Sequence, residues 1–191
     1  MSGDTADLIL DVAHRLLAER GYSAFSYADI AEEIQIRKAS IHHHFPSKTA
    51  LVVAVLERHR LRTQQAFAGL DERVASPLSR LKKYVEYWET CIRSQTDPFC
   101  IAALLGAELP SLPEEVQAEV GRYFTALRQW IAKTMKEGVR QKIITLQQTP
   151  EIEAEMLMAA VHGAMLSARV NHSSALFKQV TARAVQRLST R

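Results

Sequence analysis

Three consecutive histidines, His42 to His44, lie between basic residues in the segment IRKASIHHHFPSK of residues 36–48. Imidazoles can bind metal ions, transfer protons or contact nucleic acid. Successive residues of a helix point about 100° apart, so three adjacent histidines on a helix cannot converge on one metal ion. Metal-binding histidines on one helix face are spaced near i, i+4, and this run lacks that spacing. We therefore predict no metal site here.

A second residue with chemical potential is Cys100, in the segment TDPFCIAALLGAEL of residues 96–109. Asp97 is typical of a helix N-cap and Pro98 of a first helical residue, which places Cys100 in the first turn. There the helix dipole and free amides stabilise a thiolate, so the cysteine can be reactive. The alternative is a buried, inert thiol, which is how free cysteines usually behave.

The chain that positions these residues has 191 residues, enough for one medium domain or for a small domain joined to a larger one. No apolar run is long enough for a membrane span, and the N-terminus lacks the order of a signal peptide, so we expect a cytoplasmic protein. A net charge of +3 is mild. Any case for a polyanionic partner therefore rests on local charge.

Helical periodicity runs through the whole sequence, which has only seven glycines and six prolines. It predicts an all-α fold of about nine helices. The segment AGLDERVASP, residues 68–77, predicts a break between helices. We predict a helix-turn-helix domain over residues 1–50, with a connecting helix to about residue 68, and a helical ligand-binding and dimerisation domain over residues 51–191.

The helix-turn-helix prediction rests on residues 26–45, where a tight turn joins two short helices. Apolar contacts between these helices come from Ile30, Ile34, Ile36, Ile41 and Phe45. The outward face of the second helix carries Arg37, Lys38, Ser40, His42 and His43, and no acidic residue occurs between Glu33 and Glu57. A helix of this size fits the major groove, where such donors reach base edges and phosphates. The alternative is a solvated basic face on an ordinary helical hairpin.

Residues 5–56 resemble the DNA-binding domain of the TetR family of transcriptional repressors. The likeness runs through AHRLLAERGYSAFSYADIAEEI and IRKASIHHHFPSKTAL. The family pattern has an apolar first helix ending in a Gly-Phe/Tyr step, a helix carrying Asp-Ile-Ala, and a recognition helix ending in His-Phe. A Ser/Asn-Lys step then leads into a long connecting helix. All of these occur here in order and at the family spacing.

The resemblance implies roles for six residues. Base edges are the implied targets of Arg37, Lys38 and His43. Phosphates are the implied targets of Ser40, His42 and Lys48, the last with help from a helix N-terminus. The sequence departs from the family at Gln35, where the turn usually has Gly, at Arg37, where a Ser or Thr cap is usual, and at His42, which replaces Tyr. Gln35 must therefore adopt a conformation that Gly takes more easily.

A homodimer is expected from the last two predicted helices, residues 151–170 and 173–188. Small residues on the first let two helices approach closely, and an apolar stripe follows on the second. The expected interface residues are Ala160, Gly163, Ala164, Ser167, Leu176, Val180 and Ala184. The alternative is internal packing within one subunit. A helix-turn-helix protein usually reads two half-sites with two copies, which favours the dimer.

Aromatic residues at helical spacing mark the ligand-binding region, although most aromatic stripes form core. The candidates for a cavity lining are Tyr84, Trp88, Tyr123 and Trp130, with Cys100 as a sensor. The segment around Cys100 resembles a branch of the family in which a Cys opens the sixth helix before an apolar run ending in Ala-Glu. Some members of that branch respond to electrophiles or oxidants.

We therefore predict a DNA-binding transcriptional regulator, a repressor by family habit. It is expected to bind a palindromic operator as a homodimer and to be released by a small-molecule inducer or by modification of Cys100. No cofactor is expected. One alternative is a thiol-dependent enzyme in which Cys100 pairs with His59, His162 or His172. The sequence has no Gly-rich phosphate loop, nucleophile elbow or zinc-protease motif that would support an enzyme. The other alternative is a helical interaction module without DNA binding.

Overall fold

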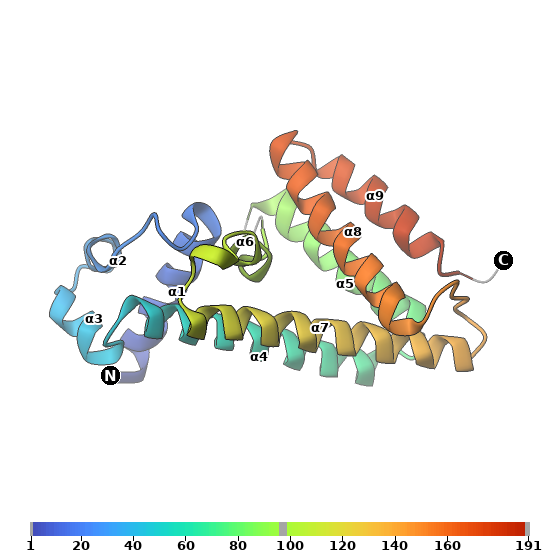
Figure 1. The fold of residues 1–191 in the computed structure, drawn as a ribbon, viewed down its shortest axis with the longest axis horizontal. Coiled ribbons are helices and arrows are strands. Elements are labelled where there is room, and N and C mark those ends of the chain that lie inside the picture. Colours follow the sequence, from blue (N-terminus) through green and yellow to red (C-terminus); the bar gives the residue numbers. More distant parts are fainter. Residues whose placement is uncertain (1, 96–98, 190–191) are drawn as a thin grey trace. The chain divides into compact units, whose positions relative to one another are not determined.

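The computed structural model describes residues 2–95 and 99–189 of the chain, with side chains from residue 5 onward. Within these residues it contains nine α-helices and one short 3-10 helix (Figure 1). The predicted all-α fold is confirmed. The elements are α1 Ser2–Arg20, α2 Tyr27–Glu33, α3 Lys38–His44, α4 Lys48–Arg73, α5 Pro77–Ser94, α6 Ile101–Ala107, η1 Leu109–Ser111, α7 Glu114–Arg140, α8 Pro150–Val170 and α9 Ser174–Gln186.

Helices α4 and α6 differ from the predicted positions in ways that bear on the candidate sites. Helix α4 continues through the expected break to Arg73, because its last turn has tertiary contacts: Asp71 accepts a hydrogen bond from the Trp130 indole at 3.2 Å. Helix α6 begins at Ile101 with Cys100 as its N-cap, so Cys100 precedes the first turn instead of lying in it. The predicted cap at Asp97 and the first helical residue at Pro98 lie outside the described residues.

Contacts divide the chain into two compact units. The first consists of Met1–Arg62 and Cys100–Phe124, and the second of Thr63–Phe99 and Thr125–Arg191. In the first unit, α1 packs on α2, α3 and α6. In the second, α9 packs on α8 and α5. The predicted domain boundary near residue 50 stays a prediction.

None of the helices in the described part of the chain combines the length and apolar character that a bilayer crossing needs.

Candidate nucleic-acid interface

Helices α2 and α3 are held together by an apolar contact and a polar one. Ile30 of α2 and Ile41 of α3 have no exposed surface. The Tyr27 hydroxyl donates a hydrogen bond to the Phe45 carbonyl at the end of α3, at 2.9 Å. Burial raises the pKa of Tyr27 to about 12, so the hydroxyl keeps its proton at neutral pH. The two helices are thus held together near the middle of α3, at Ile41, and at its C-terminal end, at Phe45.

The turn between α2 and α3 has a left-handed residue, as the sequence predicted. Gln35 has φ 55°, the region that Gly adopts without steric cost. Its side-chain amide donates to the Glu32 carbonyl at 2.7 Å, which offsets part of that cost. Arg37 is the N-cap of α3 and makes no capping hydrogen bond with its side chain. Its guanidinium is therefore not committed to the helix end.

The outward face of α3 consists of exposed cationic and imidazole side chains. Arg37, Lys38, His42 and His43 are exposed, and Ser40 is half-buried. The His42 ring also rests against Tyr27, with 4.7 Å between ring centroids. In the part of the chain that the structure describes, no three His, Cys, Asp or Glu residues are grouped so that they could hold a metal ion. This face offers hydrogen-bond donors without a nearby carboxylate on α3 itself.

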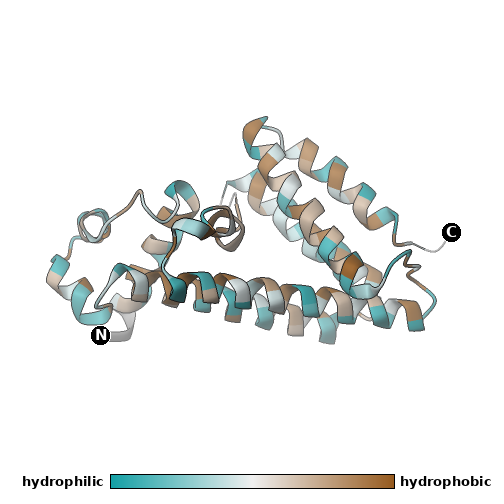
Figure 2. Ribbon diagram, in the orientation of Figure 1, coloured by the Kyte–Doolittle hydropathy of each residue, from teal (hydrophilic) through white to brown (hydrophobic). Residues whose placement is uncertain are grey.

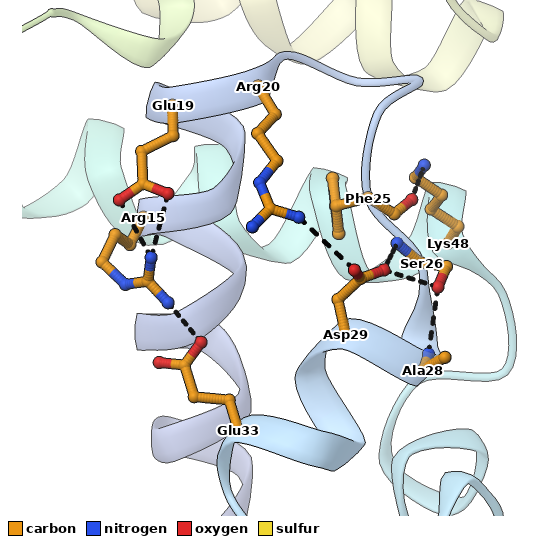
Figure 3. A network of polar contacts seen from close by, with 9 residues as sticks. All are labelled: Arg15, Glu19, Arg20, Phe25, Ser26, Ala28, Asp29, Glu33 and Lys48. Atoms are coloured by element: carbon orange, nitrogen blue, oxygen red, sulfur yellow. Dashed lines mark hydrogen bonds and ion pairs between the residues drawn. The ribbon is translucent and has the colours of Figure 1, made fainter.

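Lys48, the expected phosphate clamp, is already engaged within the chain. It is half-buried, and its ammonium donates to the Phe25 carbonyl (Figure 3). The same ammonium lies 4.3 Å from the Phe25 ring centroid and 4.9 Å from that of Tyr22. Burial lowers the Lys48 pKa, while the carboxylates of Asp29 and Glu108 oppose this shift. Lys48 therefore fixes the segment before α2, and only its remaining ammonium protons are available to a phosphate.

Exposed ion pairs tie α1 to α2. Arg15 contacts Glu19 on its own helix and Glu33 on α2, and Arg20 lies 3.4 Å from Asp29 (Figure 3). Such solvent-exposed pairs contribute little to stability. They pair two of the three acidic residues of α2, Asp29 and Glu33, while the third, Glu32, is exposed.

Sequence analysis missed several residues that support this interface. Asp29 completes a capping box with Ser26: it accepts from the Ser26 amide at 2.7 Å, while the Ser26 hydroxyl accepts from the Ala28 amide at 3.1 Å. The Ser-x-x-Asp spacing was a signal for this box, since Asp can replace the usual Glu. The hydrogen bond from Tyr27 to Phe45 had no sequence signal, because it depends on how two helices pack.

The sensor candidate Cys100 lies beside Tyr123, His59 and His14 in the first unit. Cys100 has no exposed surface, and its thiol lies 3.6 Å from the Tyr123 hydroxyl. The His59 ring stacks on Tyr123 at 5.0 Å, and His14 lies 5.6 Å from His59. Burial is the main cause that lowers the pKa of His59 to about 3 and that of His14 to about 4. Both imidazoles are therefore neutral at physiological pH.

The other ligand candidates form a separate aromatic cluster in the second unit. Trp130 stacks on Phe67 with centroids 3.8 Å apart, and Tyr84 meets Trp130 edge-on at 6.2 Å. Trp88 packs against Tyr87. An open groove of about 280 Å³ runs beside this cluster. Its lining residues are Gln64, Phe67, Ala68, Asp71, Ala126, Gln129, Trp130 and Lys133. The candidate set is thus divided, with Cys100 and Tyr123 in one unit and Tyr84, Trp88 and Trp130 in the other.

One face of α8 is both apolar and exposed, and hydrophobic residues recur along this helix in Figure 2. The large side chains on this face are Ile152, Met156, Leu166 and Val170, between 43% and 68% exposed. Gly163 lies on the same face with open space beside it. Ala164, an expected interface residue, is instead 2% exposed within the single chain. The other expected residues on these helices are exposed or half-buried: Ala160, Gly163, Ser167, Leu176, Val180 and Ala184.

Comparison with known families covers most of the chain. The family described as "Bacterial regulatory proteins, tetR family" matches residues 9–55, and "Tetracyclin repressor-like, C-terminal domain" matches residues 77–184. The chain belongs to the TetR family. It is therefore a DNA-binding transcriptional regulator and not an enzyme.

Individual relatives agree with this assignment. A TetR-family transcriptional regulator from Agrobacterium tumefaciens has a solved structure that is 42% identical, with both chains fully covered and a TM-score of 0.97. The HTH-type transcriptional repressor NemR of Escherichia coli is 24% identical over 89% of this chain and 86% of that protein. The repressor DhaR of Mycobacterium sp. is 26% identical over 86% of this chain and 82% of that protein.

Proposed function

We propose that this TetR-family regulator is a repressor that binds a palindromic operator as a homodimer. A small-molecule inducer or modification of Cys100 would release it from DNA. The observation that carries the proposal is the outward face of α3, where Arg37, Lys38, His42 and His43 are exposed while Ile41 locks the helix against α2. The repressor assignment follows the names of the relatives NemR and DhaR.

The residues of α3 divide into two kinds of contact. Arg37 stands at the start of the helix with an uncommitted guanidinium, which suits a bidentate contact to guanine in the major groove. Lys38 and His43 are exposed beside it and are proposed to lie against bases. Ser40, His42 and Lys48 are proposed to contact phosphates. Lys48 also has a structural role, because it donates a hydrogen bond to the Phe25 carbonyl next to the cap of α2.

The exposed face of α8 supports a homodimer. An apolar patch of this kind on a regulator marks a contact with another protein, and the same patch on a second copy can meet it across a two-fold axis. Gly163 permits close approach at the centre of the face. We propose an interface through this face and through Val180 of α9, and leave the buried Ala164 out of it. Two α3 helices could then enter major grooves roughly 34–36 Å apart.

Release from DNA is proposed to begin near buried groups. Cys100 is enclosed, so an adduct on its sulfur has no room unless α6 or Tyr123 moves. The aromatic cluster around Trp130 is the alternative site for a reversible ligand. Either event releases DNA only if it favours a state that the operator does not bind.

Fluorescence anisotropy on a labelled duplex tests the proposal. The duplex is the region preceding the protein's own gene or a site selected from random sequence. Wild type is expected to bind it specifically, and Arg37→Ala is expected to weaken binding and relax base preference. Binding that N-ethylmaleimide abolishes in the wild type but not in Cys100→Ser would assign release to the thiol. Binding that ignores the reagent would favour a reversible ligand, and no specific binding to any duplex would contradict the proposal.

A further inference from the structure

A carboxylate at the end of α6 contacts the turn that leads into the helix-turn-helix. Glu108 is the C-cap of α6, and its Oε2 accepts a hydrogen bond from the Tyr22 amide at 3.0 Å. Tyr22 follows the last residues of α1, so this bond joins two segments 86 positions apart in the first unit. A hydrogen bond from a backbone amide to an ionised carboxylate is stronger than one between neutral groups.

The approach of Glu108 depends on the glycine at the end of α1. Gly21 has φ 77° and is buried, and it terminates the helix in the left-handed conformation. A Cβ atom at this position would lie 2.0 Å from Glu108 Oε1. Gly21 therefore has two roles: it allows the left-handed backbone turn, and it leaves room for the Glu108 carboxylate.

Tyr22 passes this contact on to the first turn of α4 and to the segment before α2. Its hydroxyl lies 3.3 Å from the Thr49 hydroxyl, and its ring lies under the Lys48 ammonium. Lys48 in turn holds the Phe25 carbonyl, one residue before the Ser26 cap of α2. Through Tyr22 and Lys48, Glu108 is thus connected to the start of α4 and to the start of α2, the two helices that flank α3 in the chain.

We propose that Glu108 is a positioning residue for DNA binding: its carboxylate holds the Tyr22 amide, and so keeps the start of α2 and α4 in the arrangement that presents α3 to the operator. The inference rests on the proposed function and adds to it a route by which movement of α6 lowers operator affinity. The seven residues of α6 span only about 10 Å, so the helix can move as one rigid piece between Cys100 and Glu108.

Whether removal of the Glu108 carboxylate weakens or tightens operator binding distinguishes a positioning role from a purely electrostatic one. Removal of a carboxylate from a DNA-binding protein ordinarily tightens binding, because the protein becomes more positive. Positioning predicts the reverse: Glu108→Ala weakens operator binding about tenfold, the size expected for one lost hydrogen bond to a charged group. Glu108→Gln keeps an acceptor oxygen for the Tyr22 amide and is expected to retain most of the affinity.

The experiment compares full-length variants by fluorescence anisotropy on the operator duplex and by urea unfolding. For each variant, the fraction of protein that is able to bind DNA is determined by titration. Glu115→Ala is the matched control, because it removes an exposed carboxylate from the first turn of α7 in the same unit. Tyr22→Phe, which removes only the hydroxyl facing Thr49, is a second variant in case Glu108→Ala does not fold. It is expected to weaken binding about threefold.

Amide hydrogen exchange at Tyr22, measured without DNA, should be faster in Glu108→Ala and near the wild-type rate in Glu108→Gln. Unchanged or tighter operator binding by folded Glu108→Ala or by Tyr22→Phe would overturn the inference, as would a lower unfolding midpoint with wild-type affinity in the competent fraction. In each of those cases wild type still binds, and the proposed function stands. A wild type that binds no duplex defeats the proposed function and this inference together.

Discussion

Helices α3 and α8 both leave one face exposed, but the two faces have opposite chemistry. On α3 the exposed residues are Lys38, His42 and His43 together with the small Ala39, and only Ile41 is fully buried. On α8 the exposed face is built from Ile152, Met156, Leu166 and Val170. Water solvates the basic side chains of α3, whereas the exposed apolar side chains of α8 are unfavourable in a single chain. The contrast indicates two partners, a polyanion for α3 and an apolar surface for α8.

The largest expected effect breaks the α8 face. Leu166→Glu places a charge on a side chain that is 56% exposed, so the single chain should still fold while the proposed dimer dissociates. Loss of the second half-site should weaken operator binding by a factor on the order of 100 or more. Sedimentation velocity and anisotropy measure the two effects. Leu61→Glu, at a side chain 46% exposed on α4, is the control and should remain dimeric. A dimer that survives Leu166→Glu would place the interface elsewhere.

The next largest effect on operator binding is expected from a substitution at the start of α3 that leaves the exposed face of α8 unchanged. Arg37→Ala should keep the dimer but weaken operator binding by about 1–3 kcal/mol and relax preference at one base pair. Competition anisotropy with single-base variants of the duplex measures both changes. Lys82→Ala removes an exposed cation from α5 and serves as the control. Equal losses in the two variants would mean that only overall charge matters.

A third prediction contrasts the exposed histidines of α3 with the half-buried pair His14 and His59 in the same unit. The folded-state pKa values of His14 and His59 lie below the unfolded value near 6.5. Between these values the unfolded chain binds protons that the folded chain does not, so stability falls as pH falls from 6.5. At pH 5 the loss is about 2 kcal/mol for each group. Urea unfolding at pH 7.5 and pH 5 measures it.

His59→Phe should reduce this pH dependence, whereas His43→Gln on the exposed face of α3 should leave it unchanged. An equal reduction in both variants would show that the half-buried pair is not the source of the pH dependence.

The smallest effects concern how α2 is attached. Ser26→Ala removes the capping box and should lower the free energy of unfolding by about 1 kcal/mol. Arg15→Ala removes two exposed ion pairs and should cost less, about 0.5 kcal/mol or under. Urea unfolding ranks them. The reverse order would mean that the ion pairs of Arg15 stabilise α2 more than its N-terminal cap does.

The sequence was most informative where local rules decide the structure. The two short helices predicted within residues 26–45 occur as α2 and α3, because a turn and an apolar pattern define them locally. The left-handed Gln35 was likewise predictable from its place in the turn. Helix α4 extends beyond its predicted end because the contacts of Asp71 with distant residues outweigh the helix-destabilising effect of Gly69.

Residue roles were harder to predict where they depend on packing. Lys48 was expected to face phosphate, yet its ammonium is turned to the Phe25 carbonyl, which no local pattern encodes. The small residues of α8 suggested close helix contact, and Ala164 does pack closely, but within its own chain. Periodicity shows which residues share a face and not what covers that face. The contact of Glu108 with Tyr22 joins segments too far apart for any spacing rule.

The placement of the two tryptophans has a spectroscopic consequence. Trp88 and Trp130 are the only tryptophans in the sequence, and both lie in the second unit, whereas the first unit, which includes α3, has tyrosines and no tryptophan. Emission excited at the red edge of the indole band therefore comes entirely from α5 and α7. Trp130, stacked on Phe67 and hydrogen-bonded to Asp71, should respond directly to any molecule that enters the neighbouring groove. A change in that emission when unlabelled operator is added would be an optical signal of communication from α3 to α5 and α7, obtained without any label on the protein.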